Sequence, residues 1–267
     1  MRHLSVRQDP VVTIGDPLDM FRLDGQVALV TGASAGLGAR FARVLHSVGA
    51  TVVVTARRAE RLESLADELP GAIVIPADMA VPADRERLVA ETLAAAGRID
   101  VLVNNAGVSH IVGIENETLD QFEQAMSVNA TAVWHLIKLC APHMTERGSG
   151  SIVNVASMLG LVGSTPIKQA NYCASKGAVV NMTRELALQL ARKGIRVNSL
   201  CPGYFPSEMT EAMLDDDGSE RYIRTFSAIP RMGLEHELDG ALLLLATDAG
   251  SYITGHALVV DGGFTAH

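Results

Sequence analysis

One tyrosine stands midway between two lysines in the segment STPIKQANYCASKGAVV, residues 164–180. A free phenol has a pKa of about 10 and is a poor general base at neutral pH. Tyr172 and Lys176 are four residues apart, so a helix would place both side chains on one face. An ammonium group about 5 Å away would stabilise the phenolate by roughly 3 kcal/mol at an effective dielectric constant of about 20. We therefore expect a phenol whose pKa is lowered towards working pH, which could protonate a carbonyl oxygen or remove an alcohol proton.

The other lysine, Lys168, has the same spacing from the tyrosine but a different context. It follows Pro166 and precedes Asn171, a residue type that favours turns and helix starts. We expect Lys168 to lie in a loop ahead of the helix and off the helix face. Lys176 is then the lysine that tunes the phenol.

A glycine-rich turn is predicted where the apolar segment VALVT, residues 27–31, passes into an amphipathic helix. Gly32, Gly36 and Gly38 fall at this junction with the spacing G-x-x-x-G-x-G. Missing β-carbons in such a turn let a pyrophosphate approach the backbone, where free N–H groups and the helix dipole favour an anion. The turn favours a nucleotide site, and the alternative is a tight turn that only permits close packing.

The segment TVVVT, residues 51–55, is followed by Ala56, Arg57 and Arg58. In nucleotide-binding units the end of the second strand normally meets the adenosine ribose. A carboxylate there accepts from the ribose 2′-hydroxyl of NAD(H) and repels a 2′-phosphate, whereas a guanidinium fork suits the phosphate. The sequence predicts NADP(H) in preference to NAD(H), and the alternative is that both arginines simply open a solvated helix.

Seven short β-branched segments alternate with longer helical patterns and must position these residues. Such alternation is typical of a mostly parallel sheet covered by helices on both faces. We expect an α/β fold, a doubly wound Rossmann-type parallel sheet of about seven strands in a single domain. The segments are QVALVT (26–31), TVVVT (51–55), AIVI (72–75), VLVNN (101–105), SIVNVAS (151–157), RVNSLC (196–201) and ALVV (257–260).

The domain boundaries follow from what lies outside this alternation. Residues 1–22 show no sustained periodicity, so we expect an N-terminal arm ahead of one domain over residues 23–267, with a substrate loop at 204–232. The acidic run LDDDGSE at 214–220 is interpreted as a solvated loop, with a binding role as the alternative. Long helical patterns at Leu119–Met144 and Asn171–Lys193 would suit helices that pack on the sheet and against another subunit.

Composition limits the classes of function. The 267 residues are 48% hydrophobic and 19% charged, which is ordinary for a soluble globular protein. A net charge of -8 with scattered cations argues against a nucleic-acid surface. The three cysteines are too few for a disulfide framework and are not spaced with histidines like a metal site. We expect a cytoplasmic protein with no metal, no signal peptide and no membrane segment, acting on a small molecule.

Several ordered motifs together resemble one family. They are TGASAGLG (31–38), NNAG (104–107), Asn129 in SVNATAV, Ser157 in NVAS, YCASK (172–176), RVNSLCPG (196–203) and the closing ITGHALVVDGG (253–263). Through them the chain from Leu23 to Phe264 resembles the smaller, single-domain branch of the short-chain dehydrogenases/reductases. The resemblance implies an oxidoreductase, commonly a homotetramer, that transfers a hydride between a nicotinamide and a carbonyl or secondary alcohol, and Arg57 and Arg58 make NADP(H) the expected cofactor.

The resemblance also implies residue roles. Ser157 would hydrogen-bond the substrate oxygen, Lys176 would also hold the nicotinamide ribose, and Asn129 would anchor a water in a proton relay, with Tyr172 as general acid and base. Asp78 and Met79 would flank the adenine. The implied cofactor contacts are Gly32, Ser34, Ala35, Gly36, Leu37, Gly38, Arg57, Arg58, Asp78, Met79, Asn105, Ala106, Gly107, Tyr172, Lys176, Pro202, Gly203, Phe205 and Ser207.

The sequence leaves more than one possibility for the substrate and for the class of function. Fifteen positions separate Ser157 from Tyr172, more than in common members of this branch, so residues 158–171 form a lengthened loop beside the pocket. Apolar residues such as Met158 and Tyr204 favour an uncharged or hydrophobic ketone or alcohol, and His110 is interpreted as a pocket or surface residue. A catalytically silent NADP(H)-binding sensor or scaffold would need only the glycine turn and the arginines. A serine hydrolase is disfavoured because Ser157 lacks a G-x-S-x-G elbow.

Overall fold

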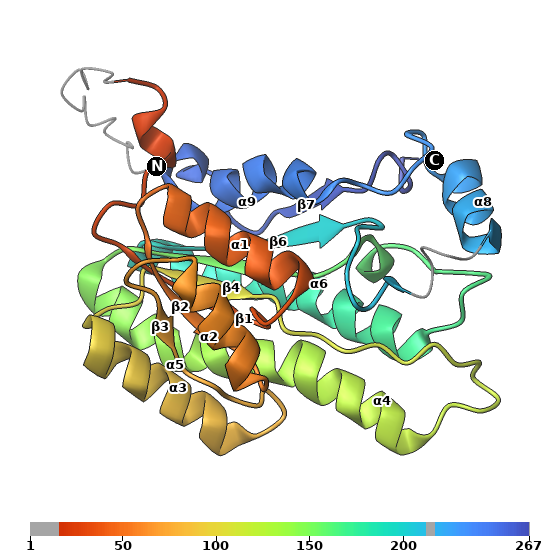
Figure 1. Cartoon of the computed structure of the whole chain (residues 1–267), viewed down its shortest axis with the longest axis horizontal. Coiled ribbons are helices and arrows are strands. Elements are labelled where there is room, and N and C mark those ends of the chain that lie inside the picture. Colours follow the sequence, from red (N-terminus) through yellow and green to blue (C-terminus); the bar gives the residue numbers. More distant parts are fainter. Residues whose placement is uncertain (1–15, 212–216, 267) are drawn as a thin grey trace, which may run out of the picture.

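Seven strands form one parallel sheet at the centre of the protein, seen in a computed structural model that describes residues 16–211 and 217–266 (Figure 1). The sheet order is β3-β2-β1-β4-β5-β6-β7, and every neighbouring pair is parallel. This confirms the expected single Rossmann-type α/β domain. The strands are β1 (Val27–Thr31), β2 (Thr51–Thr55), β3 (Ile73–Val74), β4 (Val101–Asn104), β5 (Gly150–Val155), β6 (Ile195–Pro202) and β7 (Ala257–Val260).

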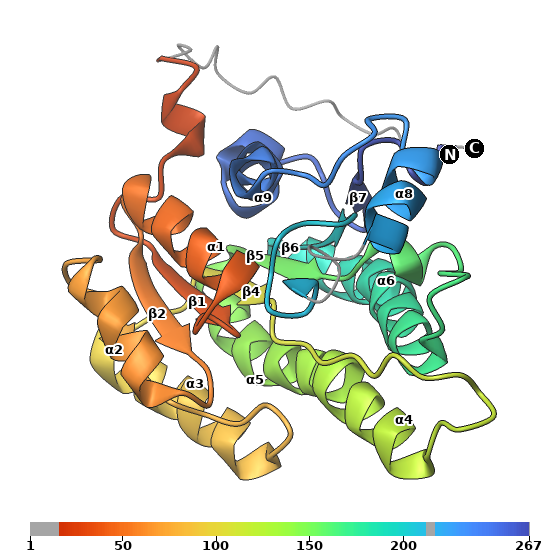
Figure 2. The same cartoon turned by 45° about the vertical axis from the view of Figure 1, so that its right-hand side comes forward.

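Helices cover both faces of the sheet. On one face α1 (Gly36–Ser47), α2 (Ala59–Asp67) and α9 (Asp239–Ala246) bury residues such as Phe41, Leu62 and Leu242. On the other, α3 (Pro82–Ala96), α5 (Ala132–Arg147) and α6 (Ala170–Leu190) bury Leu88, Leu136 and Val179. Figure 2 shows α9 and α5 on opposite sides of the strands. Because both faces are covered, the central strands are continuous apolar runs rather than alternating ones.

The helical pattern predicted over Leu119–Met144 consists of three parts. Helix α4 (Leu119–Met126) starts with a capping box between Thr118 and Gln121. A π-helical turn at Ser127–Thr131 follows, in which the Ala132 N–H donates to the Ser127 carbonyl, and α5 continues from it. Single π turns inside helices frequently occur at functional sites.

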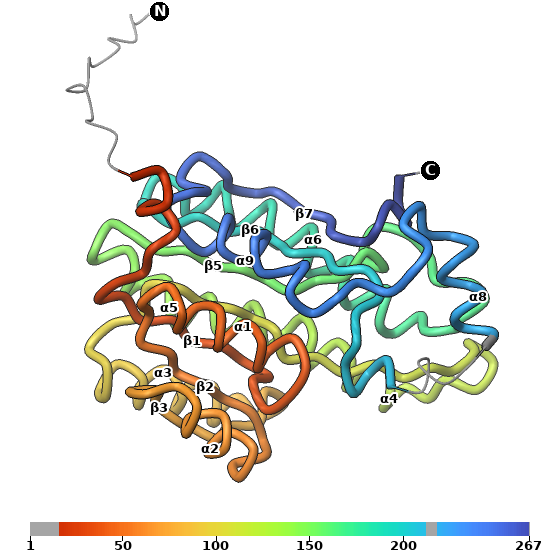
Figure 3. Tube along the Cα trace, turned by 45° about the horizontal axis from the view of Figure 1, so that its top comes forward, coloured from red at the N-terminus to blue at the C-terminus, as the bar shows by residue number. Residues whose placement is uncertain are grey.

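The other predicted long helix, Asn171–Lys193, is confirmed as α6 followed by a short 3-10 turn at Ala191–Lys193. Helix α8 (Asp217–Phe226) lies with the segment after β6 at the end of the molecule where the strands finish (Figure 3). Further 3-10 turns lie at Asp19–Phe21, Met158–Gly160, Glu235–Leu238 and Asp248–Gly250.

Two predictions on segment boundaries have different outcomes. The interpretation of residues 214–220 as a loop is wrong from Asp217 onward, because these residues begin α8, while 214–216 lie outside the described residues. Of the arm predicted over residues 1–22, residues 1–15 also lie outside them, so the arm stays a prediction. Within residues 16–211 and 217–266, no helix is long and apolar enough to cross a membrane.

Candidate active site

Three of the four predicted catalytic side chains meet at the carboxyl end of β5. Ser157 follows this strand and starts the 3-10 turn, where its Oγ accepts a hydrogen bond from Leu159 N at 3.1 Å. Tyr172 and Lys176 lie one turn apart on α6, and the Lys176 ammonium is 5.6 Å from the centre of the Tyr172 ring. Ser157 also lies close enough to the Tyr172 phenol to lower its pKa.

Lys176 is buried, with 4% of its surface exposed, and its Nζ donates to the Val155 carbonyl at 2.7 Å. This bond holds the ammonium at the end of β5. Burial lowers the pKa of Lys176 to about 8, because a charged group loses hydration there.

The pKa of Tyr172 moves in the direction opposite to our prediction. Burial raises it to about 12, and the neighbouring Ser157 hydroxyl offsets only part of this effect. The Lys176 ammonium lies over the ring and is engaged by the Val155 carbonyl, so it does not reverse the effect of burial. The predicted lowering is therefore wrong, because desolvation outweighs the neighbouring cation.

Asn129, the fourth predicted catalytic residue, lies fully buried in the π turn. Its Oδ1 accepts from Val108 N at 2.8 Å, while its Nδ2 donates to Val108 O at 2.8 Å and to Ser175 Oγ at 2.9 Å. Ser175 in turn donates to the Tyr172 carbonyl at 2.9 Å. The Asn129 amide thus ties the segment after β4 to the turn of α6 that carries the tyrosine. Ser175 was not predicted, although its place three residues after Tyr172 puts both in one helical turn.

The NNAG segment joins the predicted catalytic side chains to the glycine turn. A β-carbon placed on Gly107 would lie 3.4 Å from Asn129 Oδ1 and 3.5 Å from Lys176 Nζ. At the other end of the segment, the N–H groups of Asn105 and Ala106 both donate to Thr31 Oγ1 at 3.0 Å. The predicted cofactor residues of this segment therefore lie between the end of β1 and Lys176.

The glycine turn combines close packing with an open helix start. A β-carbon on Gly32 would lie 2.8 Å from Ala106 Cα, and one on Gly38 would lie 2.2 Å from the Gly32 carbonyl oxygen. The packing alternative therefore accounts for these two glycines. Gly36 begins α1 with a φ of 52°, and Ala35 before it has no side chain that could cap the helix. The first-turn N–H groups, from Gly36 and Leu37 onward, thus fit an anion such as a pyrophosphate.

Arg58 lies directly ahead of α2, after the strand end that is predicted to meet the adenosine ribose of the cofactor. Its Nη2 donates to Ser34 Oγ at 2.9 Å, which places the guanidinium beside the glycine turn. The same guanidinium holds both carboxylate oxygens of Glu208, at 2.8 and 2.7 Å, and Arg61 also pairs with Glu208. Arg57 is exposed. Arg58 first, and Arg61 with it, lower the pKa of Glu208 to about 2. Neither Arg61 nor Glu208 was predicted from the sequence.

The remaining predicted cofactor residues follow strands β3 and β6. The Asp78 carboxylate accepts from Ala80 N at 2.9 Å, and Met79 is buried. After β6, which ends at Pro202, Gly203 packs so closely that its β-carbon would lie 2.7 Å from Asp261 Cα. The Phe205 side chain is buried in the core, whereas Ser207 lies against the glycine turn.

The lengthened loop before α6 lies beside this site. Lys168 is confirmed as a loop residue, since α6 begins at Ala170, and its Nζ pairs with Glu115 at 2.9 Å. His110 is partly buried, with its Nε2 2.8 Å from Gln124 Oε1. An open cleft of about 420 Å³ separates these segments, lined by Ile111, Val112, Gly113, Pro166, Ile167, Lys168 and Ser219.

Aromatic and apolar side chains surround Tyr172. Met158, Leu159 and Phe264 form a small buried cluster, against which Tyr172, Cys173, Tyr204 and Tyr222 pack. Tyr222, on α8, also donates to the Thr165 carbonyl at 3.1 Å and so ties α8 to the lengthened loop.

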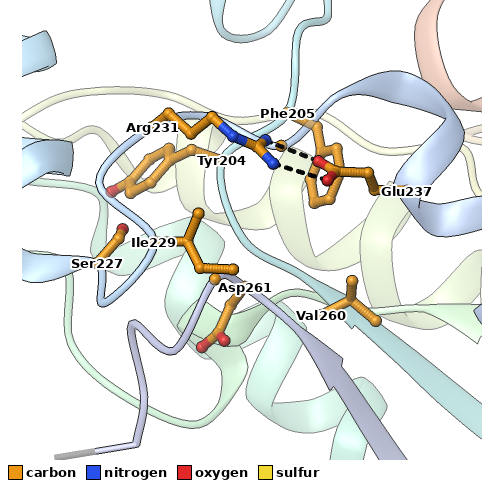
Figure 4. A pocket seen from close by; sticks show the side chains of 10 residues that line it. Tyr204, Phe205, Ser227, Ile229, Arg231, Glu237, Val260 and Asp261 are labelled. Atoms are coloured by element: carbon orange, nitrogen blue, oxygen red, sulfur yellow. Dashed lines mark hydrogen bonds and ion pairs between the residues drawn. The ribbon is translucent and has the colours of Figure 1, made fainter.

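A separate cavity of about 120 Å³ lies beside Tyr204 and Phe205 (Figure 4). Arg231 and Glu237 form a bidentate ion pair at its wall, with both contacts at 2.8 Å. Within the described ranges, none of the four predicted catalytic residues lines it.

Comparison with known proteins places the chain in a family. Residues 32–265 match the sequence model of a family described as enoyl-(acyl carrier protein) reductase. The gluconate 5-dehydrogenase of Gluconobacter oxydans (strain 621H) is 36% identical over 251 residues, which cover 92% of this chain and 97% of that protein.

Two crystal structures are similar over nearly their whole length. One is a short-chain type dehydrogenase/reductase from Mycobacterium marinum, with a TM-score of 0.89, 36% identity and coverage of 94% of this chain and 99% of that chain. The other is a gluconate 5-dehydrogenase from Burkholderia cenocepacia J2315 in complex with NADP and tartrate, with a TM-score of 0.88, 35% identity and the same coverage. The chain therefore belongs to the short-chain dehydrogenase/reductase family of oxidoreductases.

Proposed function

We propose that the chain is an NADP(H)-dependent oxidoreductase that transfers a hydride between the nicotinamide and a carbonyl or secondary alcohol, with Tyr172 as general acid and base. The observation that carries this proposal is that Ser157, Tyr172 and Lys176 lie together beside Gly107. They lie at the carboxyl ends of the strands, where α1 also begins without a side-chain cap. The alternative is a catalytically silent NADP(H)-binding sensor or scaffold. It is less favoured because such a protein has no need of a buried lysine held over a tyrosine.

The chain's own residues account for the proton transfer, while a bound nicotinamide supplies or accepts the hydride. Ser157 Oγ would bind the substrate oxygen. In reduction, Tyr172 donates its proton to that oxygen, and a pKa of about 12 keeps the phenol protonated at neutral pH. In oxidation, Tyr172 removes the alcohol proton, and the Lys176 ammonium stabilises the resulting phenolate.

Asn129 is proposed as the anchor of a water in the proton relay. Val108 and Ser175 already bind the Asn129 side-chain amide. The water would therefore bind a backbone carbonyl of the π turn rather than this side chain. Lys176 is proposed to hold the nicotinamide ribose as well.

We propose NADP(H) as the preferred cofactor, bound along the glycine turn and the NNAG segment. The support is the guanidinium of Arg58 beside Ser34, with Arg57 next to it in sequence. The related gluconate 5-dehydrogenase from Burkholderia cenocepacia contains NADP, which supports a nicotinamide cofactor here. Asp78, Met79, Pro202, Gly203, Phe205 and Ser207 remain proposed contacts.

The proposed substrate is an uncharged or hydrophobic ketone or alcohol. Met158, Leu159 and Phe264, with Tyr204 and Tyr222, surround the proposed catalytic tyrosine with apolar and aromatic surface. Gluconate dehydrogenases among the relatives act on a charged sugar acid by name, so this chain would differ from them in substrate. We also propose that it works in the cytoplasm as a homotetramer.

A panel of carbonyl compounds tests this proposal. With neutral aryl and alkyl ketones, 3-oxoacyl thioesters, keto-steroids, ketoses and 5-keto-gluconate, we expect reduction of the neutral ketones and a kcat/KM for NADPH roughly tenfold above that for NADH. Preferential reduction of 5-keto-gluconate would contradict the substrate class. Tight NADPH binding without turnover of any carbonyl or alcohol would favour the sensor instead.

A further inference from the structure

Glu208 joins the substrate loop to the proposed ribose site. It follows β6 by six residues, yet its carboxylate is bound by Arg58 at 2.8 and 2.7 Å and by Arg61 on α2. The Arg58 guanidinium also contacts Ser34 in the glycine turn. The Glu208 carboxylate is thus bound to the guanidinium beside which the cofactor ribose would lie.

The chemistry of this contact matches that of a phosphate. A carboxylate and a phosphate monoester both accept two parallel hydrogen bonds from a guanidinium fork. The side chains of Arg58 and Glu208 are 42% and 48% exposed, so a solvated phosphate can reach the guanidinium and the carboxylate can leave into water. Two anions on the same guanidinium face repel each other, which makes exchange more favourable than sharing.

We propose that Glu208 occupies the place of the cofactor 2′-phosphate on Arg58 and Arg61, so that NADP(H) binding displaces Glu208 and detaches the substrate loop from α2. This inference rests on the proposed NADP(H) specificity. It makes Glu208 a residue that weakens NADP(H) binding selectively, because NAD(H) carries no 2′-phosphate to compete with it.

The loop around Glu208 is built to respond as a unit. Ser207 N donates to Thr210 Oγ1 at 2.9 Å, and Thr210 Oγ1 donates to the Phe205 carbonyl at 2.7 Å, which closes a compact turn around Glu208. Ser207 lies against Gly36 in the glycine turn. Release of the carboxylate therefore frees the turn from α2 while its internal hydrogen bonds remain.

The test is binding of adenosine 2′,5′-bisphosphate and of 5′-AMP to the full chain, measured by calorimetry. The two probes differ only in the 2′-phosphate. We expect Glu208→Gln to bind the bisphosphate about fivefold more tightly, as expected for an exposed ion-pair network, and to bind 5′-AMP unchanged. Glu63→Gln, which removes an exposed carboxylate on α2 itself, is the matched control and should alter neither affinity.

Two further variants separate failure of this inference from failure of the proposed cofactor. Arg58→Ala should weaken binding of the bisphosphate and leave binding of 5′-AMP unchanged. In the Arg58→Ala background, Glu208→Gln should change bisphosphate affinity less than it does in the wild-type chain. Suppose that Arg58→Ala weakens binding of the bisphosphate, but Glu208→Gln leaves this affinity unchanged or lowers it. The displacement proposal is then refuted, while the proposed NADP(H) site stands. If Arg58→Ala affects both probes equally, the arginine does not read the 2′-phosphate and both proposals fail.

Discussion

At the scale of single residues, burial and a neighbouring cation compete over the proton of Tyr172. The spacing of Tyr172 and Lys176 was enough to predict that they share a helix face, and the structure confirms it. The pKa could not be predicted in the same way, because it depends on burial, and the cluster against which Tyr172 packs joins Met158 and Leu159 to Phe264 near the other end of the chain. Desolvation raises the pKa of Tyr172 to about 12, so the phenol stays protonated at neutral pH.

This assignment predicts the pH dependence of carbonyl reduction. Reduction requires the protonated phenol, with a pKa of about 12, and the charged Lys176, with a pKa of about 8. The kcat/KM for reduction should therefore be flat near neutral pH and fall as the pH rises through about 8, because the lysine loses its proton before the tyrosine does. Initial rates at saturating NADPH across this range measure it. A rate that keeps rising above that point would contradict the assignment.

At the scale of secondary structure elements, the sequence predicted the strands and the glycine turn better than the segments that connect them. All seven β-branched segments form strands, and burial of the central ones on both faces leaves a strong apolar signal. The π turn around Asn129 was not predicted, since an inserted residue does not interrupt a helical pattern of apolar residues. The contact of Glu208 with α2 was missed because loop conformation decides it, and no spacing signals it.

The glycine turn gives a prediction at this scale. Gly38→Ala should reduce the free energy of unfolding by about 1–3 kcal/mol, because its β-carbon would lie 2.2 Å from the Gly32 carbonyl oxygen and force α1 away from the turn. Gly240→Ala, on α9, is the matched control, since a β-carbon there has no neighbour within 4 Å. Urea unfolding of the two variants measures the difference. Equal stability of both would show that α1 can move without cost.

At the scale of the whole molecule, the single doubly wound domain was predictable because strand and helix patterns alternate to the end of the chain. The packing of Tyr222 from α8 and of Phe264 near Tyr172 was not predictable, because three separate segments of the chain meet there. Large apolar side chains stay exposed on α4 and α5, among them Leu119, Phe122 and Trp134. They support the proposal that these helices meet another subunit.

The proposed homotetramer gives a prediction for the molecule in solution. Light scattering should yield roughly four times the chain mass of 28.3 kDa. Trp134→Glu should reduce this mass, because a charge would replace a large apolar residue, 45% exposed, in the proposed interface. Val81→Glu, at an exposed apolar position ahead of α3, is the control and should leave the mass unchanged. A monomeric wild-type chain would refute the proposed assembly.

The most direct test of the central proposal is to compare cofactor binding with turnover in Tyr172→Phe. This change removes the phenolic oxygen and leaves the ring in its apolar surroundings. We predict that the variant binds NADPH with nearly the wild-type Kd and loses turnover by roughly a hundredfold to ten-thousandfold, the range attributed to one general acid. Undiminished carbonyl reduction by Tyr172→Phe would contradict the proposed mechanism.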